Sequence, residues 1–137
     1  MKRVVLTSSF AAVGAWGLID ERNKVYTEDD WYPLTLEQAE AAGDDKVVAY
    51  LASKKFAELA AWKIQKEQGV KWELIVLNPP MVYGPLMHKV KNMEDLNEST
   101  ARLWNSFLKE KNVDGELPPN GVHIYVDVRV SKPFWPT

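Results

Sequence analysis

The chain has 137 residues, of which 46% are hydrophobic and 26% charged, as in an average globular domain. Its net charge of −2, with both signs mixed along the chain, offers no basic surface for nucleic acids or anionic membranes. The absence of cysteine excludes disulfides, a thiol nucleophile and a Cys-based zinc site. The two histidines, His88 and His123, are far apart in sequence, so we expect no metal site.

The N-terminal stretch MKRVVLTSSFAAVGAWG combines a basic start with an apolar run, as a signal peptide does. Because Thr7, Ser8 and Ser9 interrupt that run, we interpret it as part of the fold and expect a cytoplasmic protein. Residues 2–9 then predict a strand buried on both faces, which is typical of a parallel sheet. Residues 14–34 are rich in turn-forming residues and predict a loop.

Two helices are predicted next. The stretch TLEQAEAAG predicts a short helix, with Thr35 and Gln38 as a capping box and Gly43 after its end. A longer, alanine-rich helix is predicted from about Lys46 to Gln68, because the aspartates before it suit the positive end of a helix dipole.

The remaining elements lie in the second half. Residues 71–80 predict a second buried strand that ends at two prolines, and VYGP after it predicts a turn. A third helix is predicted from about Glu98 to Lys109. The alternation of apolar and polar residues over 122–130 predicts a half-buried strand, and 131–137 suggest no element. Strand, long helix and strand within 80 residues predict a βαβ unit with parallel strands.

Tyr50 and Lys54 are four residues apart in the long helix and therefore face the same way. A lysine ammonium beside a phenol favours the phenolate, so such a phenol can exchange a proton with an alkoxide or alcohol. The chain has five tyrosines and is rich in lysine. The spacing alone therefore also fits two solvent-facing residues on a helix.

Three segments are predicted to converge on one rim of the sheet. Ser9 follows the first strand, Tyr50 lies near the start of the long helix, and residues 78–80 follow the second strand. Ligands of open parallel sheets bind beyond the carboxyl ends of the strands. A serine hydroxyl there could donate to a carbonyl oxygen while Tyr50 protonates it. Ser8 is disfavoured because alternation turns it the other way.

The segments RVVLTSSFAAV, TEDDWYP, AYLASKKFAELAAW and LIVLNPPMVYGP follow one another in this order. Together they resemble an extended short-chain dehydrogenase/reductase, of the NAD-dependent epimerase/dehydratase type. The chain is most similar to fungal NADPH-dependent aldehyde and ketone reductases, which are related to plant dihydroflavonol reductases. The resemblance covers residues 2–129. It implies an oxidoreductase that reduces a small aldehyde or ketone with NADPH.

The resemblance also implies roles for individual residues. Ser9 would be the catalytic serine, Tyr50 the proton donor, and Lys54 the residue that activates Tyr50 and holds the nicotinamide ribose. The cofactor's nicotinamide end would contact the segment Asn78, Pro79, Pro80 and Val82. Phe10 and Met81 fall where relatives line the substrate pocket, although a role in the core would suit both equally well.

The resemblance implies an α/β fold: a partial Rossmann-like parallel sheet with flanking helices, lacking the first βαβ units. Residues 1–85 would be the C-terminal half of a Rossmann-type domain, and 86–137 part of a substrate-binding region. None of the seven glycines forms the family's glycine-rich phosphate turn. We therefore weigh a second interpretation, in which the chain is a truncated, catalytically silent remnant that cannot bind NADPH alone. The substrate and the oligomeric state are left open.

Overall fold

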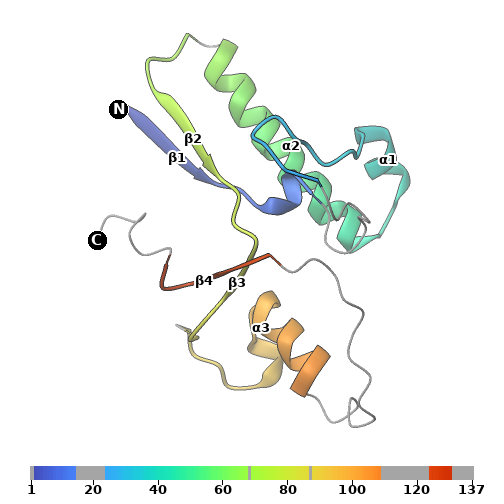
Figure 1. Ribbon diagram of the computed structural model, residues 1–137. Coiled ribbons are helices and arrows are strands. Elements are labelled where there is room, and N and C mark those ends of the chain that lie inside the picture. The colour runs from blue at the N-terminus through green and yellow to red at the C-terminus, as the bar shows by residue number, and fades with distance from the viewer. Residues whose placement is uncertain (1, 15–23, 68, 87, 109–123, 131–137) are drawn as a thin grey trace. The chain divides into compact units, whose positions relative to one another are not determined.

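The computed structural model describes residues 2–14, 24–67, 69–86, 88–108 and 124–130. Contacts divide the chain into two compact units, Met1–Pro80 and Met81–Thr137. The expected division by function, after residue 85, stays a prediction. Figure 1 shows strands and helices in both units, as an α/β fold requires.

The first unit is built on two parallel strands, β1 (Arg3–Thr7) and β2 (Glu73–Leu77). Arg3 lies opposite Glu73, and their side chains form an exposed ion pair with an N–O distance of 2.9 Å. The long helix α2 (Lys46–Glu67) stands between the two strands in sequence and contacts β2 (Figure 1). The predicted βαβ unit with parallel strands is thus confirmed.

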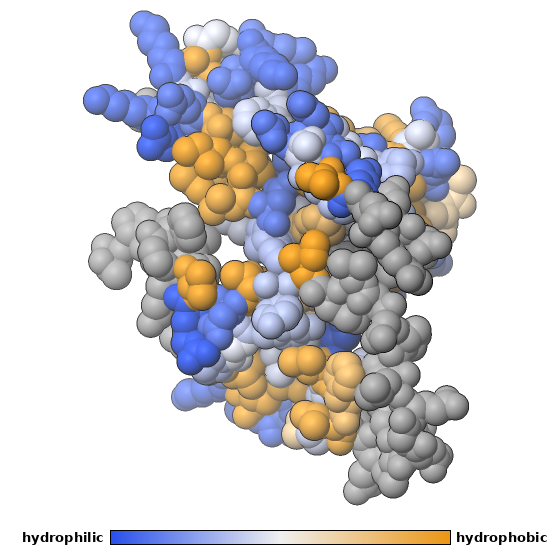
Figure 2. Space-filling model, in the orientation of Figure 1, coloured by the Kyte–Doolittle hydropathy of each residue, from blue (hydrophilic) through white to orange (hydrophobic). Residues whose placement is uncertain are grey.

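The two faces of this sheet differ in exposure. Leu74 of β2 is 9% exposed, whereas its neighbour Ile75 is 38% exposed and the paired Val5 is 48% exposed. Because successive side chains of a strand point to opposite faces, one face is packed and the other is open. Figure 2 shows hydrophobic residues gathered on the surface over these strands. The expectation that both strands are buried on both faces is wrong for the described residues.

Local sequence accounts for the helix ends. Helix α1 (Leu36–Ala41) begins at the predicted capping box: Thr35 Oγ1 accepts from the Gln38 N–H at 3.2 Å, and Gln38 Oε1 accepts from the Thr35 N–H at 2.9 Å. After α1, Gly43 has a φ of +60°, a conformation that glycine adopts without strain. At the start of α2, the Asp45 carboxylate accepts from two backbone N–H groups, of Val47 and Val48.

One short element was not predicted. The 3₁₀ helix η1 (Phe10–Ala12) lies within the apolar stretch after β1, and its residues Ala11 and Ala12 are buried. It contacts α2, which runs past it (Figure 1). Two alanines allow that close approach, because their side chains are small. The described part of the predicted loop, residues 24–34, contains neither helix nor strand.

The second unit contains another parallel pair, β3 (Met81–Tyr83) with β4 (Tyr125–Asp127). A 3₁₀ helix, η2 (Met93–Asp95), precedes helix α3 (Glu98–Leu103), which continues as a π-type segment, η3 (Trp104–Leu108). The third predicted helix is confirmed up to Leu108, and its last residue lies outside the described part of the chain.

Two expectations for this unit are wrong. The stretch predicted as a turn, VYGP, begins within strand β3. Among the described residues 124–130, only Tyr125–Asp127 form the strand predicted over 122–130, because the chain turns after Asp127. The Asp127 carbonyl accepts from the Val130 N–H at 2.9 Å, and its side chain accepts from the Arg129 N–H at 2.8 Å. Residues 122–123 and 131–137 lie outside the described residues.

Candidate active site

Ser9 stands at the carboxyl end of β1, where the chain turns into η1. It is the N-cap of η1, and its Oγ accepts from the Ala11 N–H at 3.2 Å. The residue is only 8% exposed. A serine suits this position because its short side chain can bond to the backbone of the next turn. The same bond fixes the hydroxyl at the rim of the sheet.

Tyr50 reaches this serine from the second turn of α2. Its hydroxyl donates to Ser9 Oγ at 3.4 Å, a long hydrogen bond that joins residues 41 positions apart. The residue is 51% exposed, so a ligand can reach its phenol group. The structure therefore brings together Ser9 and Tyr50, while Ser8 donates its backbone N–H to the carbonyl of Leu77.

Lys54 lies one helical turn after Tyr50, and its Nζ is 5.7 Å from the centroid of the Tyr50 ring. This distance is within the range of a cation–π contact. The lysine is half-buried. The neighbouring Lys55 is directed elsewhere, since its Nζ donates to the Leu34 carbonyl at 2.7 Å.

The hydrogen bonds that Ser9 accepts leave one group of its side chain free to act on a ligand. A hydroxyl oxygen has two lone pairs and one proton. The Ala11 N–H and the Tyr50 hydroxyl occupy the two lone pairs. The Ser9 proton is then the donor that remains, and it is suited to a carbonyl oxygen placed beside the two hydroxyls.

The segment Asn78–Pro80 follows β2 and lies beside the same turn. The Phe10 N–H donates to the Pro79 carbonyl at 3.0 Å, which ties this segment to the residue after Ser9. The Asn78 side chain donates from Nδ2 to Glu58 Oε1 at 3.5 Å. Pro80 is the last residue of the first unit and is half-buried. The structure thus joins residues 78–80 to the rim that carries Ser9.

Two further predicted residues, Met81 and Val82, belong to β3 in the second unit, where they pair with Tyr125 and Val126. Both are half-buried. Their expected roles toward substrate and cofactor stay predictions.

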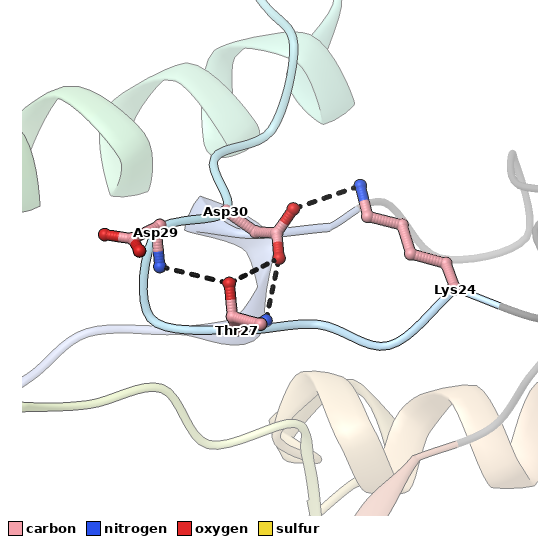
Figure 3. Close-up of polar contacts among 4 residues, drawn as sticks. All are labelled: Lys24, Thr27, Asp29 and Asp30. Carbon is pink, nitrogen blue, oxygen red and sulfur yellow. Dashed lines mark hydrogen bonds and ion pairs between the residues drawn. The ribbon is translucent and has the colours of Figure 1, made fainter.

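Phe10 is half-buried and packs edge-on against Tyr26, with ring centroids 5.2 Å apart. Figure 3 shows the turn that follows Tyr26: Thr27 donates to Asp30 from its backbone N–H at 2.7 Å and from its hydroxyl at 3.0 Å, and Lys24 lies 3.3 Å from the same carboxylate. These bonds lower the pKa of Asp30 below its ordinary value, and the bond from the Thr27 backbone N–H has the largest effect.

Sequence reasoning missed two residues here, Tyr26 and Glu58. Tyr26 has no motif around it, and only the folded turn brings it to Phe10. Glu58 did leave a signal, because it is a charged residue seven positions after the buried Leu51 and so falls on the buried face of α2. Its contact with Asn78 could not be read from that spacing.

Neither a metal cluster nor a membrane span is found in the described part of the chain. No group of three or more histidine, cysteine, aspartate or glutamate residues there could hold a metal ion. No described helix is long and apolar enough to cross a bilayer. His88 is exposed, and its Nε2 lies 3.2 Å from the Asp95 carbonyl oxygen.

The first unit is thus a parallel α/β unit of the Rossmann type, which brings Ser9, Tyr50 and Lys54 to one rim of its sheet. No protein-family model matches the chain. It is 46% identical over 130 residues to an uncharacterised oxidoreductase of Schizosaccharomyces pombe, a match that covers 94% of this chain and 37% of that protein.

A second relative is the NADPH-dependent methylglyoxal reductase of Saccharomyces cerevisiae, 39% identical over 131 residues, which are 94% of this chain and 36% of that protein. The crystal structure of the yeast methylglyoxal/isovaleraldehyde reductase complexed with NADPH superimposes with a TM-score of 0.67 at 35% identity, covering 94% of this chain and 36% of that one. The chain is therefore a homologue of the fungal NADPH-dependent reductases among the short-chain dehydrogenases/reductases. It spans little more than a third of the length of these relatives.

Proposed function

We propose that this chain carries the proton-transfer residues of an NADPH-dependent reductase that converts a small aldehyde or ketone into an alcohol. The observation that supports this most directly is the hydrogen bond from the Tyr50 hydroxyl to Ser9 Oγ, with the Lys54 ammonium beside the phenol ring. These three residues come from two elements, and the fold brings their polar groups to one rim.

The described residues suit the nicotinamide end of the cofactor. Lys54 offers an ammonium donor for ribose hydroxyls, and Tyr50 offers its exposed phenol group beside it. Residues 78–80 border the same turn through the Phe10–Pro79 backbone hydrogen bond. The glycine-rich turn that would hold a pyrophosphate is not among the 137 residues. When bound, NADPH would supply the hydride for the carbonyl carbon.

The protein's own residues would handle the carbonyl oxygen. The remaining Ser9 proton would donate to that oxygen and so polarise the C=O bond. The Tyr50 hydroxyl would exchange its bond to Ser9 for one to the substrate, and would give up its proton as the alkoxide forms. The phenolate left on Tyr50 would be stabilised by the nearby positive charge of Lys54.

A fluorescence titration of the purified, folded chain with NADPH tests this proposal, followed by measurement of carbonyl reduction. We expect saturable binding, and a loss of turnover of about 10²–10⁴-fold in Tyr50→Phe, because that variant lacks the donated proton. Tyr125→Phe is the matched control, since Tyr125 is an exposed tyrosine in the second unit and should retain activity.

The second candidate function is a chain that retains these residues without binding cofactor by itself. It is favoured by the missing glycine-rich turn. If a folded chain shows no binding up to millimolar NADPH, this second candidate is correct and the reductase proposal fails for the isolated chain.

A further inference from the structure

Glu58 is a charged residue that the proposed chemistry does not use, yet it is only 5% exposed. It lies on α2 four residues after Lys54, and seven residues after the buried Leu51. Seven residues are close to two helical turns, so Glu58 points to the same side of α2 as Leu51. A carboxylate therefore occupies a position where an apolar side chain would be expected.

The contacts of Glu58 do not compensate fully for its burial. Its Oε1 accepts from Asn78 Nδ2 at 3.5 Å, which is a long hydrogen bond. Glu58 Oε2 and Asn78 Oδ1 are also buried, and neither has a donor among the described residues. Buried acceptors without donors destabilise a fold, and an apolar residue of similar size often stabilises it. Stability alone thus does not account for a glutamate at this position.

What the pair does achieve is a link between two parts of the candidate active site. Glu58 belongs to the helix that carries Tyr50 and Lys54. Asn78 begins the segment after β2, and its two neighbours accept backbone hydrogen bonds from the Ser9 turn: Leu77 from Ser8, and Pro79 from Phe10. One side-chain contact therefore connects the helix to the strand end beside Ser9.

A carboxylate can only accept hydrogen bonds, whereas an asparagine amide has one donor side and one acceptor side. Facing Glu58, the Asn78 amide must present its NH₂ group, and its oxygen is directed elsewhere. The glutamate thereby fixes both the position and the orientation of Asn78. A leucine at position 58 would fix neither.

We propose that Glu58 is a positioning residue, which holds Asn78 and the segment 78–80 in place relative to Tyr50 and Lys54. Its relevance to the cofactor rests on the proposed function, in which this segment meets the nicotinamide end of NADPH. The positioning itself can be measured without any ligand.

Hydrogen exchange of backbone amides in the full chain provides that measurement. In Glu58→Leu we expect the Ser8 and Phe10 amides, which donate to Leu77 and Pro79, to exchange about tenfold faster, because local opening of the segment becomes easier. The amides of Leu51 and Ala52 inside α2 should keep their rates. Glu58→Gln retains an oxygen that accepts from Asn78 and should restore slow exchange. Glu67→Leu, at the exposed end of α2, is the matched control.

The outcomes separate positioning from a merely structural role. Equal acceleration of all amides in Glu58→Leu, or no change at Ser8 and Phe10, overturns the proposal. If Glu58→Leu does not fold, Asn78→Ala removes the same link from the other side and should give the same selective acceleration. Unchanged exchange in Asn78→Ala would equally contradict it.

NADPH titration of the same variants tests the connection to the cofactor. We expect Glu58→Leu to raise the Kd for NADPH about tenfold, and Glu58→Gln to leave it near the original value. If the unsubstituted chain does not bind NADPH, the proposed function fails, and the exchange rates still decide whether Glu58 positions the segment. Selective exchange with an unchanged Kd would show that Glu58 does not act on cofactor binding.

Discussion

Gly14 lies against the aromatic pair formed by Phe10 and Tyr26. A methyl group at this position would be 2.9 Å and 3.0 Å from two carbons of the Phe10 ring, and 3.1 Å from the Tyr26 hydroxyl oxygen. Real side chains avoid contacts this short, so one of the rings would have to move. Close approach of these two rings therefore favours glycine at this position, next to the turn that carries Ser9.

We expect Gly14→Ala to lower the free energy of unfolding by about 1–3 kcal/mol through overpacking. Urea denaturation measures this change. In a Phe10→Leu background the ring is absent, so the same substitution should cost much less. Gly69→Ala is a useful contrast, because nothing lies within 4 Å of its added methyl while its φ of +56° is strained for alanine. The loss of unfolding free energy in Gly69→Ala should be the same with and without Phe10→Leu. If the loss in Gly14→Ala were also the same in both backgrounds, crowding by the Phe10 ring would be contradicted.

At the scale of a single element, β2 places a packed residue beside an exposed one. Leu74 is buried and its neighbour Ile75 is more than a third exposed. We expect Leu74→Ala to cost about 2–5 kcal/mol, because it leaves a cavity among packed side chains. Ile75→Ala removes a similar apolar volume from the open face and should cost clearly less. Urea denaturation of both variants under the same conditions measures the two losses of unfolding free energy. Equal losses would show that both faces of the sheet are packed.

The elements of the first unit were predictable because their signals are local. The capping box of Thr35 and Gln38 marked the start of α1, and a continuous apolar run marked each strand. The apolar runs by themselves did not predict the open face of the sheet, because such a run looks the same whether one face or both are covered. In the second unit, β4 ended early because Asp127 bonds to the backbone two residues on, which overrides the alternating pattern.

The candidate active site was predictable to the extent that its residues follow strand ends or share a helix turn. The proximity of Ser9 to Tyr50 follows from the βαβ arrangement. The contacts of Glu58 with Asn78 and of Tyr26 with Phe10 depend on tertiary packing. No spacing rule encodes such contacts, so sequence alone could not supply them.

Across the whole molecule, three described carboxyl groups, those of Asp30, Glu37 and Asp127, have a lowered pKa. For Asp127 the Arg129 side chain is the main cause, followed by the Arg129 backbone N–H, and the pKa falls to about 2. Glu37 is exposed, and Asp30 and Asp127 are half-buried, so solvent screening keeps each contribution modest.

A group with a lowered pKa in the folded state stabilises the fold above its ordinary pKa, and this contribution is lost as the pH falls toward the folded value. We therefore expect the urea midpoint to stay level between about pH 7 and 5 and to fall between about pH 4 and 2. NMR titration of the Asp127 carboxyl should give a pKa of about 2, and a higher value in Arg129→Ala. An ordinary pKa for Asp127 in the unsubstituted chain would contradict the ion pair.

Tyr50, Lys54 and Glu58 recur every fourth residue along α2, a helix that is continuous from Lys46 to Glu67. Each residue of an α-helix advances its direction by about 100°. Adding or deleting one residue between any two of these three would therefore swing one of them away from the rim, even though every side chain were retained. A substitution at a position between them leaves the directions of these three side chains unchanged, whereas an insertion or deletion there does not. The number of residues between Tyr50 and Glu58 therefore matters as much as the identity of these residues.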